Sequence, residues 1–480
     1  MTYNKFSTLI GIPALAIASP ALAREAAQPA GDPIGIVVVA TGFARSADET
    51  GQAISVITRD RLDQLQSVTV ADALSTLPSV SVSRRGPVGT QTGVFVRGAN
   101  TSQTLVLVDG VRVNDPSSPN AAFDFGGLLA GNVERIELLR GPNSIVWGSQ
   151  AIGGVVNIET ALPSTALTLR TTAEYGTYDT LNGQVSVAGS SGVLGYSLGG
   201  AFYRTNGFSV FSGGTERDGS RQAALNGRIA LALAEGVELD LRGSWSDGRI
   251  DYDSAYSGGA NSLAEAHNRQ WFGYAGVNFT AAGGRLRSRI AVSRSDIDRV
   301  GTDPVVFSFN NYVATGVTNR IEYRGAYDLS DGVTLFAGLE HEHVRSSTSY
   351  EGAAPDRASN RMTGGYVQVS LRPLDWLTLT GGGGHGPPSD YGGHPPPGGE
   401  TAPHPHRGGA PVRATYAEGF RAPTLTEGQP PYGNPALKPE TARNLDIGIE
   451  QHLLDGRASL SLPWYRRRST DLITFSFASF

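Results

Sequence analysis

Residues 237–245 read Val-Glu-Leu-Asp-Leu-Arg-Gly-Ser-Trp, and this stretch decides the fold class of the chain. Every odd-numbered position is apolar or glycine, and every even-numbered position is polar or charged. A period of two places one kind of side chain on each face of a β-strand. Similar alternation occurs at 445–450 and 458–462. The second part of the chain is therefore predicted to be a sheet with one apolar and one polar face.

The connections between these predicted strands are of two kinds. Tight turns are expected at 330–332, 373–375 and 454–456, and long polar stretches at 205–222 and 250–268. Short turns at one rim and long loops at the other are typical of outer-membrane β-barrels. A soluble β-sandwich is the alternative, but Glu238, Asp240 and Arg242 on one face fit a hydrated lumen better than a dry core. We predict an all-β-dominated, antiparallel membrane barrel over 161–480.

Composition excludes several classes of protein. The 480 residues include 62 glycines and no cysteine, and the formal net charge is -5. Without cysteine there is no disulfide, thiol nucleophile or cysteine metal site. The histidines at 267, 341, 343 and 452 follow no Ser/His/Asp pattern, so an enzyme is not expected. The charge indicates no nucleic-acid partner, and the lack of a long apolar run after the N-terminus excludes a spanning helix.

The N-terminus has the features of a secretion signal. Lys5 precedes an apolar stretch at 6–18, and small residues at 21–23 precede Arg24. We predict a signal peptide over 1–23, whereas an anchoring helix would be short and interrupted by Pro13. Residues 24–49, rich in Ala, Gln, Pro and Gly at their start, are expected to form a flexible leader.

Between the leader and the barrel, residues 50–160 have the pattern of a compact α/β unit. Strands are expected at 53–58, 105–108 and 133–139, and a helix is expected at 70–77, stopped by Pro78. The unit is predicted to be a separate small domain.

Ordered motifs in this unit are more specific than any periodicity. They lie at 77–80, 94–98, 106–112, 133–137, 140–142 and 147–158, followed in the barrel by 419–427 and 433–440. In this order they resemble the TonB-dependent outer-membrane receptors, with 50–160 as the plug. The resemblance implies an outer-membrane location in a Gram-negative cell and contact with its lipid. Such barrels have 22 strands, and the residues after the plug would supply roughly 14, so we expect the barrel to continue past Phe480.

Two of the motifs resemble the cobalamin transporters within that family. Residues 97–102 run directly into 104–114, and 151–157 carry a second match. The resemblance implies TonB-dependent active import of cobalamin. Siderophore receptors share most of these residues, so uptake of another metal chelate stays an alternative, as does a non-transporting fragment.

Ligand contacts are expected on the apical loops of the plug. The resemblance points to these residues: Gln91, Gly93, Asn100, Ser118, Pro119 and Asn120. Cobalamin offers amide groups, which the polar side chains of this set can bind through hydrogen bonds. The alternative is that these residues form solvated turns.

Two further roles follow from the family. Ile36, Val37, Val38 and Val39, in a TonB-box-like segment at 36–42, are expected to add as a strand to the energy-coupling protein TonB, or else to form an edge strand of the next domain. Calcium is expected at the acidic loop segments, with Glu216, Asp218, Asp253 and the carbonyl of Tyr252 as ligands and Glu265 as a further candidate. The alternative is a set of solvated acids, because Ser209 stands where the family has an acid.

Two expectations concern scaffold. Arg97, Arg112, Arg135 and Arg140 are predicted to pair with carboxylates of the barrel wall. Residues 381–411, with runs of glycine and proline and four histidines, are expected to form a loop and no spanning strands, and their histidine spacing matches no defined metal site.

Overall fold

The computed structural model describes residues 36–37, 42–253, 262–304, 311–351, 353–385, 397–403, 412–429, 433–453 and 458–475. The predicted signal peptide and most of the leader lie outside these residues. None of the helices in the described ranges is long and apolar enough to cross a membrane.

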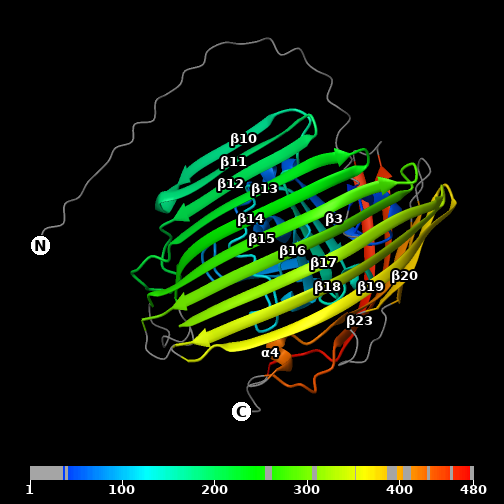
Figure 1. The fold of residues 1–480 in the computed structure, drawn as a ribbon. Coiled ribbons are helices and arrows are strands. Elements are labelled where there is room, and N and C mark those ends of the chain that lie inside the picture. The colour runs from blue at the N-terminus through cyan, green and yellow to red at the C-terminus, as the bar shows by residue number, and fades with distance from the viewer. Residues whose placement is uncertain are drawn as a thin grey trace, which may run out of the picture. The chain divides into compact units, whose positions relative to one another are not determined.

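One large antiparallel sheet contains fifteen strands of the described chain, in sequence order from β10 to β24 (Figure 1). Its strands are β10 Thr168–Gly176, β11 Thr180–Ser191, β12 Leu194–Thr205, β13 Ser220–Ala234, β14 Val237–Tyr252, β15 Ala264–Ala281, β16 Leu286–Thr302, β17 Tyr312–Ser330, β18 Val333–Tyr350, β19 Asp356–Leu374, β20 Leu377–His385, β21 Pro397–Pro403, β22 Val412–Arg421, β23 Glu440–Leu453 and β24 Ala458–Thr470. The predicted number, about 14, is close to this.

The alternation that decided the fold class is seen directly in β14. The Asp240 side chain is fully buried on the inner face, whereas neighbouring Leu241 is 36% exposed. On the other strands, Ile290, Ile321 and Leu339 are 50 to 64% exposed on the same outer face. A sandwich would bury this apolar face, so the outward exposure agrees with a sheet that faces lipid.

The connections divide as expected between two rims. At one end, which we call the short-turn rim, several strand pairs are separated by two residues, at 192–193, 235–236, 331–332 and 375–376. At the other end, the long-loop rim, residues 206–219, 253–263, 303–311 and 422–439 separate them. The last of these holds a short helix, α4 Leu425–Gly428.

The prediction of no strands within 381–411 was wrong. Strand β20 extends through Gly381 to His385, and β21 pairs with both β20 and β22. Pro397 and Pro403 are the first and last residues of β21, the positions where a strand tolerates the missing N–H. His394, His404 and His406 lie outside the described residues.

The N-terminal domain has a small mixed sheet. Its order is β3-β8-β9-β6-β7, in which only β6 and β9 are parallel. The strands are β3 Ala53–Thr58, β6 Thr104–Val108, β7 Val111–Arg112, β8 Val133–Arg140 and β9 Gly154–Thr160, with a separate hairpin of β4 Val80–Arg84 and β5 Thr92–Val96. The helices are α1 Arg59–Leu65, α2 Val70–Ser75 and α3 Ser144–Trp147, with 3-10 turns η1 Ala47–Glu49, η2 Thr101–Gln103 and, in the large sheet, η3 Thr177–Asp179.

The predicted elements of this domain are confirmed with small shifts at their ends. Helix α2 starts at a capping box in which Thr69 and Asp72 bond each other's backbone N–H groups. It ends at Ser75, ahead of Pro78, which cannot continue a helix. The first described strand, β1 Ile36–Val37, pairs with β2 Arg45–Ser46.

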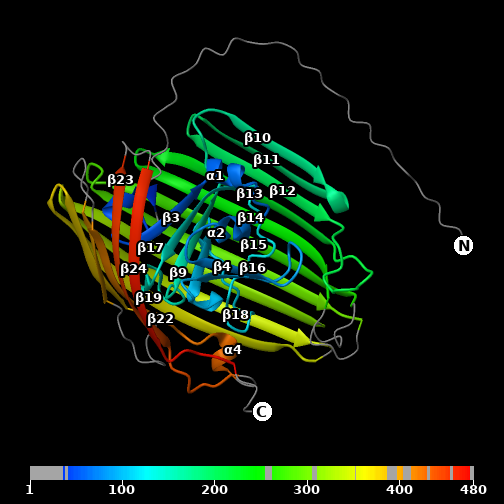
Figure 2. The same cartoon turned by 180° about the vertical axis from the view of Figure 1, so that it is seen from behind.

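The small domain packs against the inner side of the large sheet (Figure 2). Val106 and Ile136 of the small sheet share a buried cluster with Phe272 and Ile297 of the large one. The Trp147 ring lies under the Arg324 guanidinium, 4.1 Å from the ring centroid. The shared apolar cluster holds the small domain, and with it the plug loops, in a fixed position against the large sheet.

Candidate functional site

The loop of residues 115–121 lies near the long-loop rim and is organised by one carboxylate. Asp115 Oδ1 accepts the Ser117 backbone N–H at 2.8 Å and its hydroxyl at 2.7 Å. Asp115 Oδ2 forms an ion pair with Arg299 Nε of β16 at 2.9 Å. These bonds tie the loop to the barrel wall and preset its conformation.

Three predicted ligand residues belong to this loop and differ in exposure. The Ser118 side chain is buried, and its hydroxyl donates to Asn120 Oδ1 at 3.3 Å. Pro119 is exposed, and its carbonyl accepts the Thr424 hydroxyl at 2.7 Å. Since Thr424 lies on the connection that carries α4, Pro119 and the partly exposed Asn120 are at the long-loop rim. Ser118 supports the turn.

Of the other three predicted ligand residues, Gln91 precedes β5, Gly93 lies on β5, and Asn100 lies on the turn after it. Gln91 and Asn100 are exposed. A Cβ on Gly93 would come within 2.8 Å of Thr101 Cγ2, so Gly93 permits close packing. Neighbouring Gln103 contacts Glu440 at 2.8 Å, at the long-loop end of β23, which places the Asn100 turn near that rim.

Two of the four predicted plug–wall arginines reach the barrel. Arg97 pairs with Asp446 at 2.6 Å, and Arg112 pairs with Glu342 at 3.1 Å. In both ion pairs, the arginine side chain and its carboxylate partner are at least 90% buried. The alternation in β18 was a signal that Glu342 faces inward, but sequence reasoning did not identify it as a partner.

The remaining two arginines have hydrogen-bond and ion-pair partners within the plug. Arg135 pairs with Glu137 at 3.0 Å and Glu159 at 2.7 Å, both within the small sheet. Arg140 donates to the Ser55 hydroxyl at 2.9 Å. Both side chains extend from β8, whose partners β3 and β9 supply acceptors before the wall is reached.

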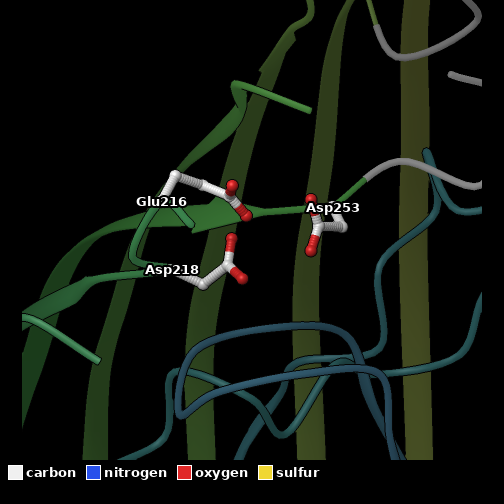
Figure 3. A group of neighbouring side chains, drawn as sticks. All are labelled: Glu216, Asp218 and Asp253. Atoms are coloured by element: carbon white, nitrogen blue, oxygen red, sulfur yellow. The ribbon is translucent and has the colours of Figure 1, made fainter. Parts of the chain in front are cut away.

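Three of the predicted calcium ligands meet at the long-loop rim (Figure 3). Glu216 and Asp218 come from the connection before β13, and Asp253 follows β14. Each offers an oxygen within 4.8 Å of the others. Glu216 Oε2 is buried and has no hydrogen-bond partner among the described residues. An unsatisfied buried carboxylate oxygen beside two further carboxylates suits a hard cation with oxygen ligands.

Backbone groups offset part of the negative charge in this cluster. Asp218 Oδ2 accepts the Val210 N–H at 2.6 Å, and Asp253 Oδ2 accepts the Phe211 N–H at 2.8 Å. Burial raises the pKa of Asp218, the Val210 N–H opposes this, and the Asp253 and Glu216 carboxylates raise the pKa further. Ser209, where an acid was expected, donates its hydroxyl to Glu216 at 2.9 Å.

Two of the predicted ligands are engaged elsewhere. The Tyr252 carbonyl accepts the Ser262 hydroxyl at 3.3 Å. Glu265 pairs with Arg249 at 3.1 Å and is outside the three-carboxylate group. Among the predicted carboxylate ligands, Glu216, Asp218 and Asp253 lie together.

The leader segment is only partly described. Ile36 lies opposite Ser46, and Val37 lies opposite Arg45, in the short β1–β2 ladder. Val38 and Val39 lie outside the described residues. A ladder of two residue pairs is a weak structure, because few backbone hydrogen bonds hold it together.

A strand-rich sheet with an apolar outer face, long loops at one rim and an inner domain whose arginines pair with the wall defines a plugged outer-membrane receptor. Comparison with known families agrees, because the TonB-dependent receptor plug domain matches residues 46–155. The TonB-dependent receptor-like β-barrel matches residues 163–480, well over half of the chain. The chain belongs to the TonB-dependent receptor family and is an outer-membrane protein.

One curated relative is the vitamin B12 transporter BtuB of Photobacterium profundum, with 30% identity over 365 residues. The match covers 72% of this chain, and the chain spans 56% of that protein's length. Among solved structures, the ferripyoverdine receptor of Pseudomonas aeruginosa has a TM-score of 0.72 at 16% identity, covering 91% of this chain and 65% of that one. The siderophore receptor PirA of Acinetobacter baumannii has a TM-score of 0.70 at 20% identity, covering 87% and 71%.

Proposed function

We propose that this chain acts in TonB-dependent active import of cobalamin across the outer membrane. The observation that carries the proposal is its 30% identity with a vitamin B12 transporter. Exposed Asn100 and the partly exposed Asn120 lie near the long-loop rim, where an amide-bearing ligand would arrive. Amide groups pair well with one another because each has both donors and an acceptor.

In this proposal the three segments have separate tasks. The plug, 50–160, binds the ligand, and the barrel from residue 161 encloses the path. The leader, 24–49, pairs with TonB through residues 36–39 by adding a strand to that protein. Pulling on the leader displaces part of the plug, which the buried pairs Arg97–Asp446 and Arg112–Glu342 otherwise hold against the wall. No covalent bond is made or broken.

We further propose that Glu216, Asp218 and Asp253 hold calcium and order the loops that carry them. Support comes from the convergence of three carboxylates from two connections and from the buried, unpartnered Glu216 Oε2. Calcium takes six to eight oxygen ligands, so water and backbone carbonyls would complete the site.

A ferric siderophore is the second candidate ligand. Its support is the fold similarity to receptors of ferripyoverdine and other siderophores, at 15 to 21% identity. Similarity at this level concerns the fold, whereas the cobalamin proposal depends on residues at aligned positions.

The two candidates are separated by one titration. The chain, folded in detergent micelles, is titrated in parallel with cyanocobalamin and with a ferric siderophore, and binding is followed by calorimetry. We expect heat of binding with cobalamin only. Binding of the ferric chelate alone would overturn the cobalamin assignment.

A further inference from the structure

Three arginines gather on the outer face of the large sheet, close to the long-loop rim. Arg345 lies on β18, and Arg357 and Arg361 lie on β19. Arg345 is directly opposite Ser359, so the other two arginines are its diagonal neighbours on the same face. All three side chains are exposed. We call these three residues the arginine patch.

No acid neutralises the arginine patch within the described residues, where none of its three members makes an ion pair. Arg294, on the same face, differs from these three arginines because it is neutralised. It donates two hydrogen bonds to Asp296, of 2.6 and 2.8 Å. His343 lies directly opposite Arg361, and it adds no negative charge. The patch is thus a local excess of positive charge.

The patch borders the apolar band that faces lipid. Leu339 is six residues before Arg345 on β18 and is 64% exposed, and Val367 is six residues after Arg361 on β19 and is 52% exposed. Because side chains alternate along a strand, all four point outward. An arginine at this depth can lay its stem along the lipid and hold its guanidinium among the headgroups.

We propose that the arginine patch binds the phosphate groups of an anionic lipid headgroup in the outer leaflet. Guanidinium groups bind phosphate oxygens in a bidentate manner, and three of them surround a region without a competing carboxylate. Like charges placed on neighbouring strands repel one another, and a bridging phosphate removes that repulsion. The acyl chains of the lipid then lie on the apolar band beside Leu339 and Val367. A free phosphate ion has no acyl chains and makes no such contact.

Native mass spectrometry of the intact 480-residue chain in detergent micelles tests the proposal. The chain is titrated with phosphatidic acid and with phosphatidylcholine of the same acyl chains. We expect tighter binding of phosphatidic acid. A membrane-surface arginine contributes about 1 kcal/mol, so Arg361→Gln should weaken phosphatidic acid binding about fivefold, and the triple Arg→Gln variant further.

Two variants serve as controls. The triple Arg→Lys variant keeps the charge and should keep the preference for phosphatidic acid. Arg294→Gln removes an outer-face arginine that Asp296 already binds, and it should leave the preference unchanged.

Three results would overturn the proposal. They are equal binding of both lipids, an unchanged preference in the triple Arg→Gln variant, and displacement of phosphatidic acid by millimolar inorganic phosphate. The last result would assign the patch to a free ion. Cobalamin binding is measured on the same variants and should not change, so this test is independent of the proposed transport function.

Discussion

Asp124 of the plug shows how one carboxyl makes stability depend on pH. Its Oδ1 accepts the backbone N–H groups of Thr92 at 2.8 Å and Gly126 at 2.9 Å. Burial raises the pKa of Asp124 to about 6, although both N–H groups oppose the rise. Because the folded pKa is above the unfolded value, the folded state favours the protonated acid. Its stabilising contribution is complete below about pH 4 and is lost as the pH rises through 6.

Asp124→Asn should remove this pH dependence. An asparagine Oδ1 can accept the same two N–H groups but carries no charge. We expect the variant to gain stability over the natural chain between pH 4.5 and 7.5, by about 2 kcal/mol at the upper end. Urea unfolding at both pH values measures the difference. Asp60→Asn, the same change at an exposed plug residue, is the matched control. An equal difference at both pH values would contradict the role of Asp124.

At Asn100, the prediction concerns ligand affinity. The side chain is exposed, and loss of one hydrogen bond to cobalamin should cost about 0.5 to 1.5 kcal/mol. Asn100→Ala should therefore weaken cobalamin binding several-fold and leave the plug folded. Asn278→Ala, on β15 towards the short-turn rim, is the matched control and should bind normally. Unchanged affinity in Asn100→Ala, measured by calorimetry, would remove this residue from the site.

Connections between strands are the elements that carry the acidic cluster. Residues 206–219 and the end of β14 meet because β13 pairs with β14 from Ser220 opposite Ile250 onward. Neither connection has enough ligands for calcium alone. The candidate site is a property of two neighbouring elements.

Calcium should therefore stabilise these connections together. A ligand at 100 times its Kd stabilises the folded state by about 2.7 kcal/mol, so we expect 1 mM calcium to raise the Tm and a chelator to reverse the rise. Asp218→Asn, which can keep the bond from Val210 N–H, should lose the calcium response. Glu265→Gln, outside the group, should retain it. If the Tm of the natural chain does not change when calcium is added, the three carboxylates are solvated and bind no calcium.

In the leader, we expect the backbone to contribute more than the side chains to binding of TonB. If residues 36–39 add as a strand to TonB, Val38→Pro removes an N–H from the new ladder and should abolish cobalamin uptake while ligand binding stays normal. Val38→Ala keeps the N–H and should transport. Uptake in receptor-deficient cells and binding to purified protein are measured side by side. Normal energy-dependent uptake by the proline variant would disprove the coupling role.

Buried ion pairs join the plug to the wall across the whole molecule. Arg97 with Asp446, Arg112 with Glu342 and Arg299 with Asp115 link residues between 184 and 349 positions apart. Each pair has little contact with water, so removing one partner leaves a charge without compensation. The plug is therefore held by discrete contacts that a mechanical pull could break one at a time.

Removing Arg112 alone should destabilise the chain strongly. Arg112→Met leaves the buried Glu342 without this cation, and loss of one partner of a buried pair costs about 3 to 5 kcal/mol. The double variant Arg112→Met, Glu342→Gln should recover most of that loss. Urea unfolding of both single variants and the double variant forms the cycle. Additive losses would show that the two side chains do not stabilise each other.

Much of this molecule could be predicted from local pattern. The period of two at 237–245 indicated both the strands and the face that meets lipid, because a strand alternates its side chains whatever its partners are. Turn residues and Pro78 predicted the ends of elements for the same local reason. The ordered motifs indicated the family.

Other features were decided only by tertiary contacts. Residues 381–385 and 397–403 form strands despite their glycines and prolines, because β19 and β22 on either side offer unpaired backbone groups. Among four similar plug arginines, Arg97 and Arg112 reach the wall, while Arg135 and Arg140 find nearer partners. Partner choice across hundreds of residues depends on sheet register and docking, and a local period carries no information about either.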